Sequence, residues 1–257
     1  MTPERIYKKI SRISNQNSIS KPYIVGGIPR DLYRGKLLEY NDIDLTTNSS
    51  DIMRLGVLCA ESFRSFFRVF SDGHMSVYLK DYALDFSSNF VSRQAEEHLA
   101  KEGMSDEYLK EVYSRDFTIN TLHIDIETGE LTDPTNMGKE DISRGIIRSV
   151  ISPEASLLND PNRIFRAIEL SSRLGFDIDD DIINFVISNN DMIKNELDIK
   201  EAFIENIIGK SIGNNSQKTL ESLMEMNILD MVPLSGSFKQ EVIKRRMVKD
   251  YLDISES

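Results

Sequence analysis

Hydrophobic positions follow two different patterns along the chain. In its first part, short apolar runs alternate with turns and with stretches of helical spacing. Short runs rich in β-branched and aromatic residues, bounded by glycine or polar turns, predict strands. The predicted strands are residues 23–25, 43–46, 66–70, 74–79, 82–86, 122–125 and 130–131. The predicted helices cover residues 3–14, 29–35, 50–60 and 92–113, the last with a break near Gly103.

Strand patterns nearly stop after residue 137. Residues 154–252 are mostly amphipathic helices, with a break at Asn214-Asn215 and a loop over 233–238. This layout predicts an α+β fold, with a mixed-sheet head over residues 1–148 and an all-helical part over residues 149–257. Phe63, Phe66, Phe67 and Phe70 are expected in the core of the head, and not in a base-stacking platform.

Composition narrows the class of protein. The 257 residues are 40% hydrophobic and 28% charged, which is an ordinary balance for a soluble globular protein. The longest apolar run is far shorter than the roughly 18 residues of a membrane span, and the N-terminus lacks the apolar region of a secretory signal. A lone cysteine, Cys59, excludes an intramolecular disulfide framework and a cysteine-rich zinc site. We therefore expect a cytoplasmic protein.

The net charge of −11 bears on nucleic-acid binding. Proteins that bind phosphate backbones without sequence preference usually carry a basic surplus. Any nucleic-acid contact of this chain must therefore be local.

Three aspartates carry the strongest chemical signal. Asp42 and Asp44 lie two residues apart on a predicted strand, so they share one face while Ile43 and Leu45 face the core. Two adjacent carboxylates repel each other unless a cation lies between them, and Mg²⁺ prefers oxygen ligands. Asp85 lies on another predicted strand. If the two strands are neighbours, three acids converge as in a two-metal site for phosphoryl transfer.

A glycine turn precedes these acids. Gly26-Gly27 follows a predicted strand and precedes a short helix, where glycine permits close approach of a phosphate to main-chain N–H groups. Arg30 follows and is suited to neutralise phosphate charge, with Asp31 placed to hold an arginine. Each feature alone is most often a simple turn or surface pair. Their combination on a strand–turn–helix–strand pattern is far more specific.

In these residues the chain resembles the tRNA nucleotidyltransferase and poly(A) polymerase family, in its bacterial-type (class II) form. The family's GG-x-x-RD and D-x-D are GGIPRD and DID here, and its RRDFTINA is SRDFTINT, residues 114–121. DPTNMG and NDPNRIFR, followed by RLGF, match two later motifs. The resemblance spans residues 22–178. It implies a polymerase β-like head followed by a helical neck and a truncated body.

The resemblance also implies site residues. Asp42, Asp44 and Asp85 would hold two Mg²⁺ ions and carry catalysis. The nucleotide, CTP or ATP, would be bound by Gly26, Gly27, Arg30, Asp31, Arg115, Asp116, Asn120, Asp160, Arg163 and Arg166. Within this set, Arg115 and Asp116 would hold the triphosphate or the ribose, and Asp160 and Arg163 would act as a protein template for the base.

The base-selecting role of Asp160 and Arg163 also follows from their chemistry. Pro161 favours a helix start there, and residues three apart on a helix share a face. A carboxylate accepts from an exocyclic amino group, and a guanidinium donates to a ring nitrogen. Cytosine and adenine both offer an amino group beside an acceptor, whereas uracil and guanine present a carbonyl there. The alternative is a helix cap with a surface ion pair.

Three positions depart from the family pattern. Ser114 replaces an arginine, Asn159 replaces an acid, and Glu169 stands where many members carry a further arginine. These changes weaken the positive lining expected of a nucleotide pocket, and they bear on base selectivity.

The resulting expectation is a template-independent RNA nucleotidyltransferase that adds CMP and AMP to an RNA 3′ end, most simply in tRNA CCA addition or repair. Poly(A) addition is an alternative within the same chemistry. A non-catalytic nucleotide- or RNA-binding relative is a second alternative, against which the three retained acids argue. Nucleotidyl transfer to a protein or a small molecule is a third. The sequence leaves the oligomeric state open.

Overall fold

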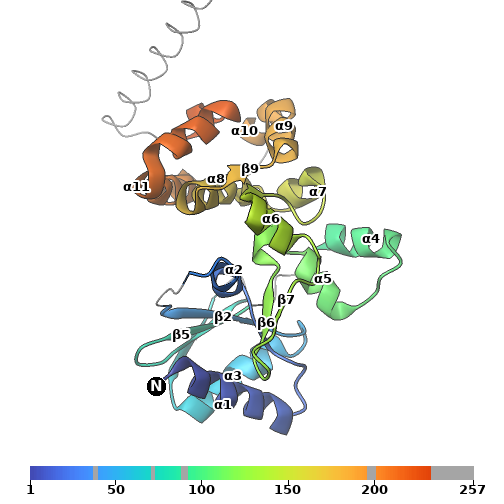
Figure 1. Cartoon of the computed structure of the whole chain (residues 1–257), viewed down its shortest axis with the longest axis vertical. Coiled ribbons are helices and arrows are strands. Elements are labelled where there is room, and N and C mark those ends of the chain that lie inside the picture. Colours follow the sequence, from blue (N-terminus) through green and yellow to red (C-terminus); the bar gives the residue numbers. More distant parts are fainter. Residues whose placement is uncertain (37–39, 71–72, 88–91, 196–200, 233–257) are drawn as a thin grey trace, which may run out of the picture. The chain divides into compact units, whose positions relative to one another are not determined.

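The computed structural model describes residues 1–36, 40–70, 73–87, 92–195 and 201–232 (Figure 1). The chain forms two compact units, residues 1–159 and 160–257. The first unit therefore continues past the predicted head boundary at residue 148, because helix α7 (Pro153–Asn159) packs against helix α4 (Arg93–Lys101) of the head. The predicted loop over 233–238 lies outside the described residues.

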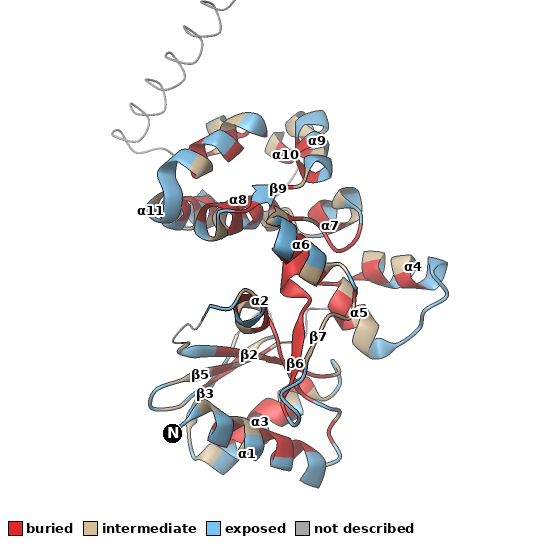
Figure 2. Cartoon of the chain, viewed as in Figure 1, coloured by how far each residue is buried: buried red, intermediate tan, exposed pale blue. Residues whose placement is uncertain are grey.

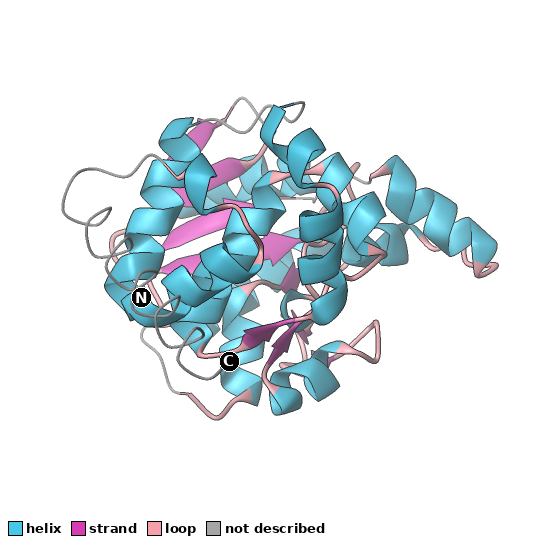
Figure 3. Ribbon diagram, turned by 90° about the horizontal axis from the view of Figure 1, so that it is seen from above, coloured by secondary structure: helices cyan, strands magenta, loops and turns pink. Residues whose placement is uncertain are grey.

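A seven-stranded mixed sheet organises the first unit. Its strand order is β3-β4-β5-β2-β1-β6-β7, and only β2 and β5 run parallel. Figure 3 shows the strands side by side. The strands are β1 (Tyr23–Ile24), β2 (Asp42–Thr46), β3 (Phe66–Val69), β4 (Met75–Tyr78), β5 (Ala83–Phe86), β6 (His123–Asp125) and β7 (Leu131–Thr132).

Helices α1 (Pro3–Gln16) and α3 (Ile52–Phe63) cover one face of this sheet (Figures 1 and 2). Their apolar residues recur at helical spacing and pack with every second residue of the central strands, as the alternation of a half-buried strand requires. The shared core includes Ile6, Ile10, Leu55, Cys59, Ile43, Leu45, Met75, Val77, Leu84 and Phe86. The opposite face of the sheet is left for polar side chains.

The first unit has further helices besides α1 and α3. Their bounds are α2 (Gly27–Tyr33), α4 (Arg93–Lys101), α5 (Glu107–Tyr113), the short 3-10 helix η1 (Thr118–Asn120), α6 (Gly138–Arg144) and α7 (Pro153–Asn159), with strand β8 (Ile146–Ile147) between the last two. Gly103 separates α4 from α5 with a φ of +71°, which confirms the predicted break.

Over its described residues the second unit is mainly helical, as predicted. It contains α8 (Asn162–Leu174), β9 (Asp177–Ile178), α9 (Asp180–Ser188), α10 (Asn190–Asn195), α11 (Glu201–Glu225) and the 3-10 helix η2 (Leu229–Met231). Helix α11 packs along α8 and is kinked at Asn215, where the backbone leaves helical geometry. The kink falls at the predicted Asn214-Asn215 break.

No helix within the described ranges combines the length and the apolar character that crossing a bilayer requires.

The prediction for the phenylalanines is wrong in part. Phe63 packs against the core, but Phe66 is 72% exposed and Phe67 is 42% exposed. Both lie on β3, an edge strand of the sheet, which has a neighbouring strand on one side alone within the part of the chain that the structure describes. Hydrophobic alternation identifies a strand but does not say whether it is central or at an edge.

Gly138 is a position where the packing admits no side chain. A Cβ atom there would lie 2.4 Å from Leu122 Cδ1 and 2.6 Å from the carbonyl oxygen of Thr118. We therefore expect Gly138→Ala to lower the free energy of unfolding by about 1–3 kcal/mol, as overpacked sites do.

The matched control is Gly209→Ala in α11, where a Cβ meets nothing within 4 Å. In a helix interior this change should stabilise by about 0.5–1 kcal/mol. Urea unfolding of both variants measures the effect, and a Gly138→Ala protein as stable as the wild type would contradict the packing described here.

Candidate functional site

The three predicted acids lie side by side on the polar face of the sheet. Asp42 and Asp44 alternate with the buried residues Ile43 and Leu45 on β2. In the parallel β2–β5 pairing, Asp44 is directly opposite Asp85. Asp42 is exposed, whereas Asp44 and Asp85 are half-buried. The structure thus brings together the three carboxylates that the sequence placed on two separate strands.

The oxygen ligands on this face are those that a hard divalent cation prefers. Carboxylate oxygens at neighbouring positions repel each other and favour a cation between them. Ser76 on β4 pairs with Asp85 in the sheet, and its hydroxyl donates to Asp85 Oδ1. Across the residues that the structure describes, no group of three or more His, Cys, Asp or Glu side chains is closed into a set of metal ligands. The three carboxylates thus share one face and offer the oxygen ligands that a divalent cation prefers, but as they lie they do not form a set that could hold the ion.

The glycine turn touches this face directly. Gly26 has φ +74° and ψ −129°, a backbone conformation that glycine adopts without strain. A Cβ atom at Gly26 would lie 2.5 Å from Asp44 Oδ2. The N–H of Val25 donates to the carbonyl of Asp44 at 3.0 Å, which fixes the turn against β2. Any other residue would be strained by this backbone conformation, and its Cβ would have to displace the Asp44 carboxylate.

A buried polar network holds the helix that follows this turn. Arg30, on α2, donates Nε and Nη2 to the two carboxylate oxygens of Asp31, both at 3.0 Å. Its Nη1 donates to Asn120 Oδ1 at 2.9 Å, and Asn120 Nδ2 donates to Asp116 Oδ1 at 3.0 Å. Arg30 is only 2% exposed. Two motifs that lie 90 residues apart are therefore one charge-assisted network.

Arg115 has a different set of partners. Its Nη2 donates to Glu111 Oε1 at 2.6 Å, one helical turn earlier, and the same oxygen accepts from Thr46 Oγ1 at 3.2 Å. Thr46 is the last residue of β2, so this contact ties Arg115 to the strand of the carboxylates. The sequence prediction missed Glu111. The signal for it was an acid four residues before the motif arginine.

Ser114, which departs from the family pattern, is buried and has a structural role. Its hydroxyl donates to the carbonyl of Lys110 at 2.7 Å and accepts from the N–H of Ser92 at 3.1 Å. Ser92 in turn caps α4 by accepting from the N–H of Ala95. The serine thus joins the start of α4 to the end of α5, and an arginine, which has no acceptor atom, could not accept the N–H of Ser92.

The predicted base-reading residues lie at the start of α8, in the second unit. Arg163 Nε is 3.7 Å from Asp160 Oδ2, and Asp160 Oδ1 accepts from the N–H of Asn162 at 3.2 Å. Asp160 therefore forms a turn onto Asn162, the first residue of α8, and pairs with Arg163, while Arg166 is exposed farther along the helix. Glu169 forms an ion pair with Arg173 at 2.8 Å. An acceptor and a donor share one helix end, as predicted.

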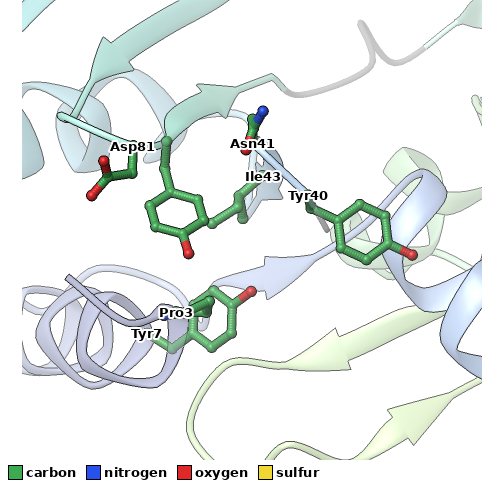
Figure 4. A pocket seen from close by; sticks show the side chains of 7 residues that line it. Pro3, Tyr7, Tyr40, Asn41, Ile43 and Asp81 are labelled. Atoms are coloured by element: carbon green, nitrogen blue, oxygen red, sulfur yellow. The ribbon is translucent and has the colours of Figure 1, made fainter. Parts of the chain in front are cut away.

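A pocket of about 360 Å³ lies on the other side of β2 (Figure 4). Ile43 lines it, and Ile43 faces away from Asp42 and Asp44, so this pocket is separate from the carboxylate face. Its lining residues are Pro3, Tyr7, Tyr40, Asn41, Ile43, Asp81 and Tyr82.

An acidic sheet face next to a glycine turn and a buried arginine network defines a nucleotidyltransferase head. Residues 22–148 match the family described as the poly A polymerase head domain. Over these residues the chain therefore carries a head domain of the tRNA nucleotidyltransferase and poly(A) polymerase family.

Known relatives agree with this assignment. A CCA-adding enzyme of Staphylococcus epidermidis is 27% identical over 91% of this chain and 55% of its own length. A CC-adding tRNA nucleotidyltransferase of Halalkalibacterium halodurans is 33% identical over 61% of this chain and 36% of its own length. The solved structure of the Bacillus stearothermophilus CCA-adding enzyme with CTP has a TM-score of 0.71 and 26% identity, covering 93% of this chain and 57% of that chain. The chain thus spans about half the length of these relatives or less.

His123 is buried beside the Arg115 network. It is 0% exposed, and its Nδ1 lies 2.8 Å from the Tyr108 hydroxyl. Burial, reinforced by the charge of Arg115, holds the pKa of His123 well below its ordinary value of 6.5. Below pH 6.5 the unfolded chain binds a proton that the folded chain rejects, so folding stability falls as the pH falls.

We expect His123→Gln, which keeps an acceptor for Tyr108, to flatten this pH dependence. Between pH 6 and 5 the wild type should lose about 1 kcal/mol more unfolding free energy than the variant. Urea unfolding at several pH values measures the two slopes. Equal slopes would show that His123 titrates normally in the folded protein.

Proposed function

We propose that this protein is a template-independent RNA nucleotidyltransferase that adds CMP and AMP, from CTP and ATP, to the 3′ end of tRNA. The observation that carries the proposal is the pairing of Asp44 with Asp85, beside Asp42 and against the Gly26 turn. The match to the family's head domain and the names of its CCA-adding relatives support the substrate class. We also propose that the protein is cytoplasmic.

The metal is proposed to be Mg²⁺, held by Asp42, Asp44 and Asp85. Two such ions, when bound, lower the pKa of an attacking hydroxyl and stabilise charge on the leaving group. With the ions held by these carboxylates, the RNA 3′-hydroxyl would give up its proton to solvent and attack the α-phosphate of the nucleotide. The new bond to the α-phosphate would form as the bond to the β-phosphate breaks, and pyrophosphate would leave. Half-burial of Asp44 and Asp85 strengthens their electrostatic effect, since fewer waters compete.

Some of the predicted nucleotide-binding residues are proposed to position the site, and others are proposed to contact the nucleotide. Arg30, Asp31 and Asn120 are buried and bonded to one another, so we assign them to positioning the glycine turn and Asp116. Arg115 and Asp116 border the same network and are proposed to hold the ribose or the triphosphate. Gly26 and Gly27 offer main chain free of side chains for close approach of phosphate.

Base selection is proposed for Asp160 and Arg163, with Arg166 adding positive charge. The carboxylate and the guanidinium already share the start of α8, and each would exchange its partner for the edge of cytosine or adenine. Glu169 weakens the positive charge of this helix and is itself paired with Arg173. We therefore propose selection of C and A by hydrogen bonds, with little help from net charge.

Two other activities within the family are alternatives to CCA addition. The relative of Halalkalibacterium halodurans is named for CC addition alone, and the matching head domain is named for poly(A) polymerase. Addition of CC only, or of A only, would use the same three acids. A non-catalytic relative is disfavoured, since Asp42, Asp44 and Asp85 are all retained on one face.

We expect Asp42→Asn and Asp85→Asn each to lower kcat for CMP incorporation by about 10³-fold or more. Loss of one ligand removes several kcal/mol of transition-state stabilisation. The control is Asp81→Asn, an exposed acid in the turn before β5 that should leave kcat unchanged. Incorporation of labelled CTP into a tRNA transcript lacking its 3′ CCA measures both. Full activity of either site variant would refute the proposed catalysis.

We expect Asp160→Ala to reduce discrimination among nucleotides while the protein still incorporates. Loss of one member of a bidentate base contact costs about 1–3 kcal/mol of discrimination, or roughly 5- to 150-fold. The kcat/KM values for CTP, ATP, UTP and GTP, each supplied alone, give the discrimination directly. Preference for C and A that survives Asp160→Ala would remove this residue from base selection.

A further inference from the structure

Strand β3 exposes an unusual set of side chains at the edge of the sheet. Phe66 is 72% exposed and Tyr78, on the neighbouring β4, is 41% exposed. Arg68, two residues after Phe66 on β3, is also exposed. Natural edge strands are usually short, charged or covered, because an open apolar edge recruits other chains. An exposed aromatic edge therefore indicates a binding surface.

The pairing register places these side chains on the face of the three carboxylates. One row across the sheet runs Asp42, Ala83, Tyr78, Phe66, and the next runs Asp44, Asp85, Ser76, Arg68. Residues paired across neighbouring strands point to the same face. Strands are about 4.8 Å apart, so β3 lies roughly 14 Å from β2. The small side chain of Ala83 separates the aromatic rings from Asp42.

The rings are already arranged in stacks, with one guanidinium among them. Phe66 and Tyr78 have centroids 5.9 Å apart and planes 22° apart. The Arg68 guanidinium lies 4.6 Å from the centroid of Phe70, and Phe70 stacks on His74 at 4.0 Å. We call these five residues the aromatic edge. Aromatic faces joined by arginine are the chemistry that binds the bases and phosphates of single-stranded RNA.

Charge also favours RNA at this surface. Residues 64–80 contain three basic residues, Arg64, Arg68 and Lys80, and one acidic residue, whereas the whole chain has a net charge of −11. The local surplus of positive charge complements a phosphate backbone. A second copy that paired through its own β3 edge would bring the same positive charge to this surface, which disfavours edge-to-edge pairing of two copies.

We infer that the aromatic edge binds the last unpaired nucleotides of the RNA acceptor by stacking, and so guides the 3′ end toward the carboxylates. This inference rests on the proposed function, because it assigns the acceptor strand to one side of the same site. The aromatic edge determines how tightly the acceptor binds, while the carboxylates determine the rate of transfer.

The test compares the double variant Phe66→Ala/Tyr78→Ala with Phe67→Ala. Phe67 is the same residue type on the same strand, but it points to the opposite face and pairs with Val77. Fluorescence anisotropy with a labelled eight-nucleotide single-stranded RNA gives Kd without any need for catalysis. Steady-state incorporation of CMP into a tRNA transcript lacking CCA gives KM for the RNA and kcat.

Loss of stacking on the double variant should raise Kd and the KM for RNA by at least about fivefold, with kcat at saturating RNA unchanged. Phe67→Ala should behave as the wild type. The variant Phe66→Tyr/Tyr78→Phe keeps both rings and should restore tight binding, which separates stacking from a loss of folding.

Other results overturn the inference. Equal Kd values for the double variant and Phe67→Ala would show that RNA does not bind at this surface. Light scattering that shows a dimer converted to a monomer by the double variant, with RNA binding intact, would assign the edge to a second copy. Ring-dependent RNA binding by a wild type that incorporates no nucleotide would support the aromatic edge and refute the proposed function instead.

Discussion

The close contact between the main chain of Gly26 and the carboxylate of Asp44 is the constraint on which the site depends. It places the turn after β1 against the acid at the centre of β2, and the hydrogen bond from the Val25 N–H to the Asp44 carbonyl joins the two main chains. The register of β2 and β5 then adds Asp85 at the same level. A turn without a side chain, a strand of alternating acids and one parallel pairing together place three carboxylates on one face of the sheet.

Buried charge stabilises this arrangement in one geometry. Arg30, Asp31, Asp116 and Asn120 lie away from water and satisfy one another. Removing one partner would leave a buried charge uncompensated, which is far more costly than losing an exposed ion pair. The network therefore favours a single position for α2 and for the segment before η1. Rigid support of this kind holds a reactive site in place before substrate binds.

The sequence predicted the acids, their shared face and the mixed head followed by helices, because these follow from local periodicity and from motif order. It did not predict the contact of Gly26 with Asp44, the pairing of Glu111 with Arg115, or the exposure of Phe66. These features depend on the order of strands in the sheet and on which strand lies at its edge. Its apolar character predicted that Phe66 lies in the core. Phe66 is exposed instead, because β3 lies at the edge of the sheet.

The central claim is tested most directly by Mn²⁺ binding, followed by electron paramagnetic resonance in the presence of CTP, for the wild type and Gly26→Ala. A methyl group at Gly26 would displace the Asp44 carboxylate, so the affinity for Mn²⁺ should fall by about tenfold or more, as when a metal ligand loses its support. Unchanged Mn²⁺ affinity in a folded Gly26→Ala protein would contradict the account, because the turn would then have no part in placing the acids.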